Sequence, residues 1–226
     1  MAPQLGFRIE RFSLHLAGVE IACLDVVVAP GEVLTVMGPS GTGKSSLLAA
    51  LIGALPPGFR ATGRLHLNGR EITALPTEAR RIGILFQDPL LFPHLSVGGN
   101  LAFGLPAALR PAAARREKID AALAEVGLEG FANRDPATLS GGQRARVALQ
   151  RMLLAGPEAL LLDEPFSGLD LALRRQIRTL VFTTARARGL PVILVTHDVE
   201  DAEAAGGKIV SPMGEAMGGG IRSKGQ

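Results

Sequence analysis

The pattern of hydrophobic positions along the chain predicts short buried strands that alternate with helices. The apolar runs of strand length are Val33 to Met37, Ile82 to Phe86, Ala159 to Leu162 and Pro191 to Thr196. Strands that are buried on both faces give continuous apolar runs rather than alternating ones. The sequence therefore predicts an α/β fold, in which helices cover both faces of a mostly parallel sheet.

The first thirty residues show a different pattern, in which apolar and polar side chains alternate. Phe12, Leu14 and Leu16 alternate with polar residues, and a second apolar run follows Gly18. This period of two predicts two further strands. Residues 63 to 69 predict another strand, which enters a turn at Asn68-Gly69.

Helices are predicted where apolar residues recur at three- or four-residue spacing. One begins near Gly43 and is ended by the turn Pro56-Pro57-Gly58. The others lie in an alanine-rich segment around Leu123, from about Gly141 to Leu154, and from about Leu171 to Arg188. The glycine-rich segment from Gly206 shows little periodicity, so we expect it to pack loosely.

These elements are consistent with one domain over residues 1–226. A core with a β subdomain is expected at about 1–87 and 156–210, a helical subdomain at about 88–155, and a tail at 211–226. With 47% hydrophobic residues, the chain can bury a substantial core.

Charge and cysteine content exclude several classes of protein. The 24 basic and 21 acidic residues give a net charge of +3, and the basic residues are scattered without interleaved aromatics, so we expect no nucleic-acid partner. The chain has no apolar run of the roughly 18 residues that a transmembrane helix needs. Its single cysteine, Cys23, suits a reducing cytoplasm and is expected in the core of a strand.

One segment matches G-x-x-x-x-G-K-[ST] completely, between a predicted strand and a predicted helix. It consists of Gly38, Pro39, Ser40, Gly41, Thr42, Gly43, Lys44 and Ser45, and is called the phosphate loop below. Its glycines let backbone N–H groups surround phosphate oxygens, and the helix N-terminus adds its positive dipole end. Lys44 is predicted between the β- and γ-phosphates, and the Ser45 hydroxyl on Mg²⁺.

A pair of carboxylates follows another predicted strand. Asp163 ends the apolar run Leu160 to Leu162, so it is expected at the carboxyl edge of the sheet, where ligands bind in open α/β folds. A carboxylate at this edge can hold Mg²⁺ directly or through water. Glu164, one residue later, is expected to point elsewhere and to serve a different task.

A second predicted helix start also suits an anion. Ser140-x-x-Gln143 fits a helix capping box. Gly141 and Gly142 in the first turn leave the backbone N–H donors without covering side chains, which favours an anion. Two phosphate sites in one chain require an explanation.

The order and spacing of the motifs resemble the complete motif set of ABC-transporter ATPase subunits. These motifs are Gly38 to Ser45, Gln87, Leu139 to Gln143, Leu160 to Glu164, Ser167 to Asp170 and Thr196 to Asp198. The resemblance extends from about Leu5 to Val210. Through Leu91-Phe92-Pro93-His94 it is similar in particular to bacterial importers of thiamine, polyamines, iron and molybdate.

The resemblance implies a P-loop NTPase core of mostly parallel sheet, with an antiparallel β subdomain and a helical insertion. It also implies a head-to-tail dimer. ATP and Mg²⁺ would lie between the phosphate loop of one copy and the helix start from Ser140 to Gln143 of the other. That arrangement would explain the two phosphate sites.

The roles of individual residues follow from the same resemblance. Glu164 would act as the general base or orient the attacking water, and His197 would contact the γ-phosphate; with Lys44 they form the expected catalytic set. Gln87 would belong to this set too, because it would touch either the attacking water or the Mg²⁺. The other expected Mg²⁺ ligands are Ser45 and Asp163. Asp170 would lie across the dimer interface.

The implied function is to energise the import of a small solute. The expected partners are a second copy of the chain, integral-membrane permease subunits and a periplasmic or surface solute-binding protein. The chain would be a peripheral protein on the cytoplasmic face of the inner (plasma) membrane. An ATPase of an exporter, or of a complex that moves lipoproteins or acts in cell division, remains the alternative. A DNA-repair ATPase would need long heptad segments, which the sequence lacks.

One position departs from the family pattern. These ATPases usually stack adenine on an aromatic residue about sixteen positions before the turn that here is Gly31-Glu32. That position falls on His15 or Leu16, and the chain contains neither tyrosine nor tryptophan. Either contact with adenine is weak, or His15 or Leu16 replaces the aromatic residue. In both cases the sequence predicts relaxed discrimination between ATP and GTP.

Overall fold

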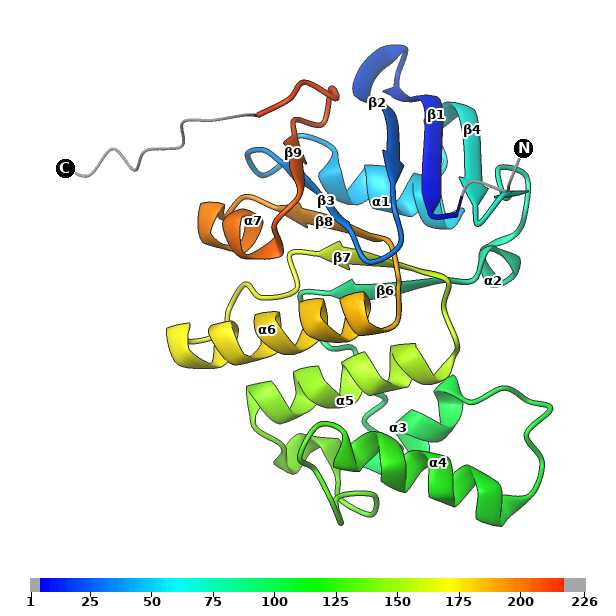
Figure 1. Cartoon of the computed structure of the whole chain (residues 1–226), viewed down its shortest axis with the longest axis vertical. Helices are drawn as coiled ribbons and strands as arrows, with labels where there is room; N and C mark the ends of the chain where they lie inside the picture. Colours follow the sequence, from blue (N-terminus) through cyan, green and yellow to red (C-terminus); the bar gives the residue numbers. More distant parts are fainter. Residues whose placement is uncertain (1–4, 218–226) are drawn as a thin grey trace. The chain divides into compact units, whose positions relative to one another are not determined.

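The computed structural model describes residues 5–217, which group into two compact units (Figure 1). Of these residues, the first unit contains 5–82, Glu158–Glu164 and 182–217, and the second contains Gly83–Pro157 and Pro165–Val181. The phosphate loop, Asp163, Glu164 and His197 therefore belong to the first unit. The helix start at Ser140 belongs to the second.

Parallel strands form the centre of the first unit, in the order β7-β8-β3-β9. They are β3 (Val33–Met37), β7 (Ala159–Asp163), β8 (Val192–Thr196) and β9 (Lys208–Val210). Every residue of β8 is buried, which agrees with its continuous apolar sequence. Met37 pairs with Thr196 and Asp163 with Val195, so the carboxyl ends of three strands lie at one edge of the sheet.

Helices pack on this sheet within the first unit. They are α1 (Lys44–Ile52) and α7 (Val199–Ala205), and a short helix α2 (Thr77–Arg80) precedes β6. Helix α1 contacts β7, and α7 contacts β3 and β8. Leu47, Leu48 and Leu51 of α1 are fully buried, as their helical spacing predicted.

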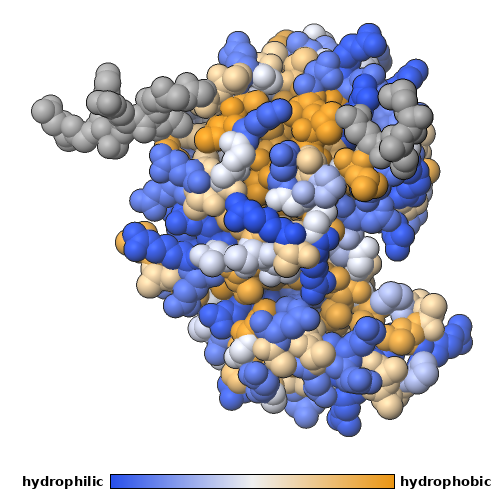
Figure 2. Space-filling model, viewed as in Figure 1, coloured by the Kyte–Doolittle hydropathy of each residue, from blue (hydrophilic) through white to orange (hydrophobic). Residues whose placement is uncertain are grey.

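An antiparallel sheet completes the first unit, in the order β2-β1-β4-β5. Its strands are β1 (Phe7–Leu16), β2 (Val19–Val28), β4 (Phe59–Leu67) and β5 (Arg70–Glu71). The register of β1 shifts between Ile9 and Phe12. Because one extra residue reverses the side-chain alternation, both of these residues remain buried. Figure 2 shows apolar surface on the upper part of the molecule in this view, which belongs to the first unit. Leu16 and Val19, at the turn between β1 and β2, have exposed side chains.

The second unit is mainly helical. Its elements are β6 (Ile82–Phe86, of which Ile82 belongs to the first unit), α3 (Val97–Gly104), α4 (Ala112–Ala124), the 3₁₀ helix η1 (Pro136–Thr138) and α5 (Gly141–Leu154). Helix α6 (Leu171–Ala187) begins in this unit and ends in the first. Helices α3, α4 and α5 share the hydrophobic core of the second unit, whose buried residues include Val97, Leu101, Leu123 and Val147.

The expectation of a loosely packed segment after Gly206 is wrong for its described part. Residues 208–210 form β9, which pairs with β3. Further on, the Pro212 carbonyl accepts a hydrogen bond from Cys23 N at 2.9 Å, and Met217 N donates to Ile209 O at 2.9 Å. The rest of the predicted tail, 218–226, lies outside the described residues. Cys23 itself is half-buried on β2 rather than in the core.

Within residues 5–217, no helix combines the length and the apolar character needed to cross a membrane.

Candidate active site

The phosphate loop joins β3 to α1, with its glycines at the positions where the backbone requires them. Gly41 has φ 82° and Gly43 has φ 84°, values that other residues rarely adopt. The Thr42 hydroxyl donates a hydrogen bond to the Pro39 carbonyl at 2.8 Å, which closes the loop on itself. Helix α1 begins directly after Gly43 and has no side-chain cap. No side chain at Gly43 caps its first backbone N–H groups. An anion site requires such uncapped donors.

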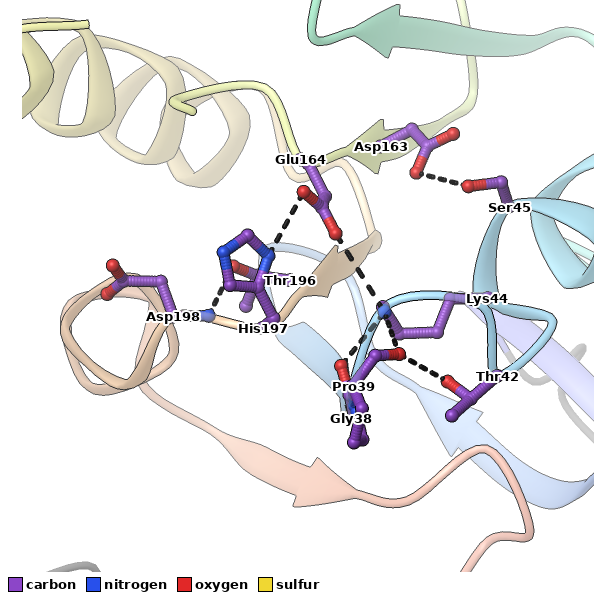
Figure 3. Close-up of polar contacts among 10 residues, drawn as sticks. All are labelled: Gly38, Pro39, Thr42, Lys44, Ser45, Asp163, Glu164, Thr196, His197 and Asp198. Atoms are coloured by element: carbon purple, nitrogen blue, oxygen red, sulfur yellow. Dashed lines mark hydrogen bonds and ion pairs between the residues drawn. The ribbon is translucent and has the colours of Figure 1, made fainter. Parts of the chain in front are cut away.

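Lys44 is held in place by the loop that it follows (Figure 3). Its side chain is only 4% exposed, and Nζ donates to the carbonyls of Gly38 and Pro39, each at 2.8 Å. These two bonds leave one of the three ammonium donors for a further acceptor. Oε1 of Glu164 lies 3.8 Å from Nζ, too far for a hydrogen bond but close enough for charge attraction.

Ser45 and Asp163 lie together although 118 positions separate them in sequence. The Ser45 hydroxyl donates to Oδ1 of Asp163 at 3.0 Å. Burial raises the pKa of Asp163, and the neighbouring Glu164 raises it further, while the Ser45 hydrogen bond and Lys44 act in the opposite direction. The hydroxyl and carboxylate oxygens form a pair of hard donors, the type that Mg²⁺ prefers.

Glu164 turns away from Asp163 because its backbone takes a left-handed conformation, with φ 46°. Its N–H donates to the Val195 carbonyl at 3.0 Å, which fixes this turn to the end of β8. Oε2 of Glu164 lies 3.1 Å from Nδ1 of His197 (Figure 3). Consequently Lys44, Glu164 and His197 form a chain of contacts at the carboxyl edge of the sheet.

His197 is positioned by the start of α7. Asp198 accepts hydrogen bonds from the N–H groups of Glu200 at 2.8 Å and Asp201 at 3.3 Å, which caps this helix. Its own N–H donates to the Thr196 hydroxyl at 3.0 Å. The cap holds the chain after β8 in a tight turn, so the half-exposed His197 side chain projects beyond the sheet edge.

A cavity of about 480 Å³ opens beside the phosphate loop, a size typical of small-molecule sites. It is lined by residues 40–46 and Glu164, together with Leu16, Ile21 and Phe59. Of the two positions predicted to replace the usual aromatic, the structure thus brings Leu16 to the cavity. Ile21 and Phe59 were not predicted. They come from β2 and β4, and no linear motif marks them.

The second unit contains the predicted helix start at α5. The Ser140 N–H donates to Oε1 of Gln143 at 2.9 Å, and the Gln143 N–H donates to the Ser140 hydroxyl at 3.3 Å, so the predicted capping box is present. The two glycines have different surroundings. A side chain at Gly142 would meet Leu173 at 2.3 Å, whereas Gly141 has its nearest neighbour, Leu169, 4.0 Å away. Packing therefore explains Gly142, while Gly141 leaves the helix start open.

The other predicted site residues in this unit are exposed. Asp170 accepts a hydrogen bond from the Leu173 N–H at 3.0 Å and so caps α6. Gln87 directly follows β6. Both lie at the boundaries of regular elements, where binding residues are common.

Comparison with known proteins agrees with this arrangement. The sequence model of the ABC transporter family matches residues 22–167. The chain is 56% identical over 181 residues to YnjD of Escherichia coli (strain K12), an "uncharacterized ABC transporter ATP-binding protein", and covers 83% of it with 80% of its own length. It is 43% identical over 220 residues to the thiamine import ATP-binding protein ThiQ of Jannaschia sp. (strain CCS1), with 90% of this chain and 95% of that one covered.

A third relative is longer. The chain is 41% identical over 187 residues to the Fe(3+) ions import ATP-binding protein FbpC of Agrobacterium fabrum, which corresponds to 83% of this chain and 52% of that protein. Among solved structures, cbiO1 of Clostridium perfringens, part of the ABC transporter complex cbiONQ, matches with a TM-score of 0.79. Its sequence is 28% identical, over 95% of this chain and 87% of that chain.

These matches and the phosphate loop define the fold as that of a P-loop NTPase. The chain belongs to the ABC transporter family and is an ATP-binding protein that hydrolyses ATP. The fold class and the family predicted from the sequence are confirmed.

Proposed function

We propose that this ATPase energises the import of a small solute through a membrane permease, by ATP-driven association of two copies of the chain. The observation that carries the proposal is the open helix start at Gly141, which would provide a second anion site besides the phosphate loop. The import direction is supported by relatives named as import ATP-binding proteins. The two units together would act as one ABC ATPase domain.

The phosphate loop would bind the triphosphate, and Lys44 would place its remaining ammonium donor on the β- and γ-phosphate oxygens. Hydrolysis transfers the γ-phosphoryl group to water, a reaction that depends mostly on positioning and charge neutralisation. The Glu164 carboxylate would orient the attacking water and accept its proton. His197, 3.1 Å from that carboxylate, would contact the γ-phosphate.

The oxygen donors of Ser45 and Asp163 suit Mg²⁺. The family resemblance assigns Gln87, in the second unit, to the ion or to the attacking water. Among residues 5–217, no group of three or more His, Cys, Asp or Glu side chains could hold a metal ion. An ion at Ser45 and Asp163 would therefore take further ligands from phosphate and water, as Mg²⁺ commonly does. When bound, it supplies charge neutralisation to the β- and γ-phosphates.

In the proposed dimer, the phosphate loop of one copy faces the α5 start of the other. Ser140 and Gln143 form the capping box that orders this start, and Gly141 and Gly142 carry no side chain. Asp170 would lie across the interface. Each ATP would then contact both copies, so that binding closes the dimer and hydrolysis opens it.

The permease partner would bind the second unit near Gln87. Phe86 and Leu90 on either side of it are 43% and 53% exposed, and such apolar side chains are suited to a protein partner. The chain would then lie on the cytoplasmic face of the inner (plasma) membrane as a peripheral protein. Neighbouring genes for a permease and a solute-binding protein would support import, and neighbouring genes for an exporter would count against it.

Replacing Glu164 tests the proposed chemistry. Glu164→Gln keeps the size of the side chain but cannot accept a proton. We expect kcat for ATP hydrolysis to fall about 10²–10⁴-fold, with the Kd for ATP changed little. Phosphate release and equilibrium nucleotide binding measure the two quantities.

The matched control is Glu203→Gln on α7, where the side chain is exposed. It should hydrolyse ATP at the wild-type rate. Undiminished turnover by Glu164→Gln would exclude the assigned role of Glu164.

A further inference from the structure

The cavity beside the phosphate loop has two chemically different walls. The polar wall comes from residues 40–46 and Glu164, while the other wall consists of Leu16, Ile21 and Phe59. These three side chains come from three strands of the antiparallel sheet. A nucleoside triphosphate has the same two parts, an anionic chain and a flat base with apolar faces.

The apolar wall adjoins the phosphate loop, and two of its residues lie beside each other on paired strands. A side chain at Gly43 would approach Ile21 to 3.2 Å, so β2 lies directly against the loop. Leu16 pairs with Phe59 across β1 and β4. The three residues therefore form a continuous surface that starts at the loop.

Phe59 has a fixed position at the beginning of β4. Gly58 has φ 90° and leads the chain out of the Pro56-Pro57 turn, and the Phe59 N–H points back to the Pro56 carbonyl at 3.4 Å. The Phe59 side chain is neither fully buried nor fully exposed. A partly exposed aromatic ring that lines the cavity can stack on a flat ligand there.

We propose that Phe59 is the ring on which the nucleobase stacks, with Leu16 and Ile21 completing the apolar contact. The inference rests on the ATP binding described above and adds the residue that contacts the base. It assigns this contact to β4 instead of the end of β1. Leu16, one of the two positions where the family resemblance places an aromatic residue, offers apolar area but no ring.

The chemistry of the same wall predicts little discrimination between bases. Leu16, Ile21 and Phe59 have no side-chain hydrogen-bonding group, so they do not distinguish the edges of adenine and guanine. Stacking accepts any base because every base has a π face. The site therefore selects a nucleoside triphosphate by its phosphates and its flat base, and binds ATP and GTP with similar affinity.

Nucleotide binding to the isolated chain tests the proposal, with ATP, GTP and inorganic triphosphate as probes in the presence of Mg²⁺. Phe59→Ala should weaken ATP and GTP by about tenfold or more, the effect of losing one base–aromatic stack. It should leave the affinity for inorganic triphosphate unchanged. Phe59→Tyr should bind ATP and GTP as the wild type does, since tyrosine keeps an aromatic ring at this position.

Phe103→Ala is the matched control, because Phe103 lies on α3 in the second unit and is 70% exposed. It should bind all three probes like the wild type. Two results for Phe59→Ala would overturn the role of Phe59 without affecting the proposed function. One is an unchanged affinity for ATP, and the other is an equal loss of affinity for inorganic triphosphate. A wild-type preference for ATP over GTP of about a hundredfold would also overturn this role, since edge recognition is then required. A wild-type chain that binds neither ATP nor triphosphate would overturn the proposed function too.

Discussion

At the scale of single residues, the surroundings of Asp163 disfavour the negative charge of its carboxylate. Burial raises its pKa, with a further contribution from Glu164. The folded chain thus binds the Asp163 proton more tightly than the unfolded chain does. Ionised Asp163 consequently lowers the free energy of unfolding above its raised pKa, and this loss is recovered as the pH falls. A bound cation would compensate the same charge.

Asp163→Asn should therefore raise the free energy of unfolding at pH 7, measured without nucleotide or Mg²⁺. Asparagine keeps an oxygen acceptor for Ser45, 3.0 Å away in the native chain, but carries no charge. The gain should shrink as the pH falls through the raised pKa toward the usual carboxyl range. Denaturant unfolding at pH 7 and pH 5 measures this, with the exposed Asp120→Asn on α4 as control. A destabilised Asp163→Asn at pH 7 would contradict the account.

The sequence predicted the residues of the phosphate loop because a single continuous segment contains the whole motif. The base-binding wall could not be predicted in this way. Leu16, Ile21 and Phe59 meet only through the pairing of β1, β2 and β4. Sequence counting left His15 and Leu16 as equal alternatives, since it does not give the strand register.

At the scale of elements, the start of α5 separates a packing role from a binding role. Gly142 faces Leu173 so closely that a side chain would need it to move, while Gly141 faces open space. Adjacent glycines in one motif therefore have different reasons for being glycine. The motif alone did not distinguish them.

This difference predicts different effects of the same substitution at the two positions. Gly142→Ala should lower the free energy of unfolding by about 1 kcal/mol, the low end of the cost of overpacking, because the half-buried Leu173 side chain has to move aside. Gly141→Ala should stay within about 0.5 kcal/mol of the wild type, as an uncrowded surface change does. Urea unfolding measures both. Equal destabilisation by the two variants would show that Leu173 is not the cause.

Elements with a regular apolar period or a continuous apolar run were predicted from the sequence, whereas α3 and β9, which show neither clearly, were missed. Helix α5 begins and ends where the spacing and the capping box placed it, at Gly141 and Leu154. Helix α3 contains three glycines that obscure its period, and a side chain at Gly98 would come within 3.0 Å of the Ala132 carbonyl. Strand β9 has only three residues, and it is a strand because β3 offers it an edge.

At the scale of the whole molecule, each unit has one helix start that we propose as an anion site. The first unit has α1 behind the phosphate loop, and the second has α5 behind Ser140. Motif order was enough to predict the family. It does not reveal what would bring the two kinds of helix start to one nucleotide, because we propose that this requires a second copy of the chain. The central claim is thus that ATP joins two copies head to tail.

The mass of Glu164→Gln in solution, measured with and without ATP and Mg²⁺, tests this claim most directly. We predict a monomer without ATP and a species of twice that mass with ATP. Adding Gly141→Asp places a negative charge at the open start of α5, where there is room for a side chain. The double variant should still bind ATP through its phosphate loop but remain a monomer. Dimerisation of the double variant to the same extent as Glu164→Gln would contradict the account.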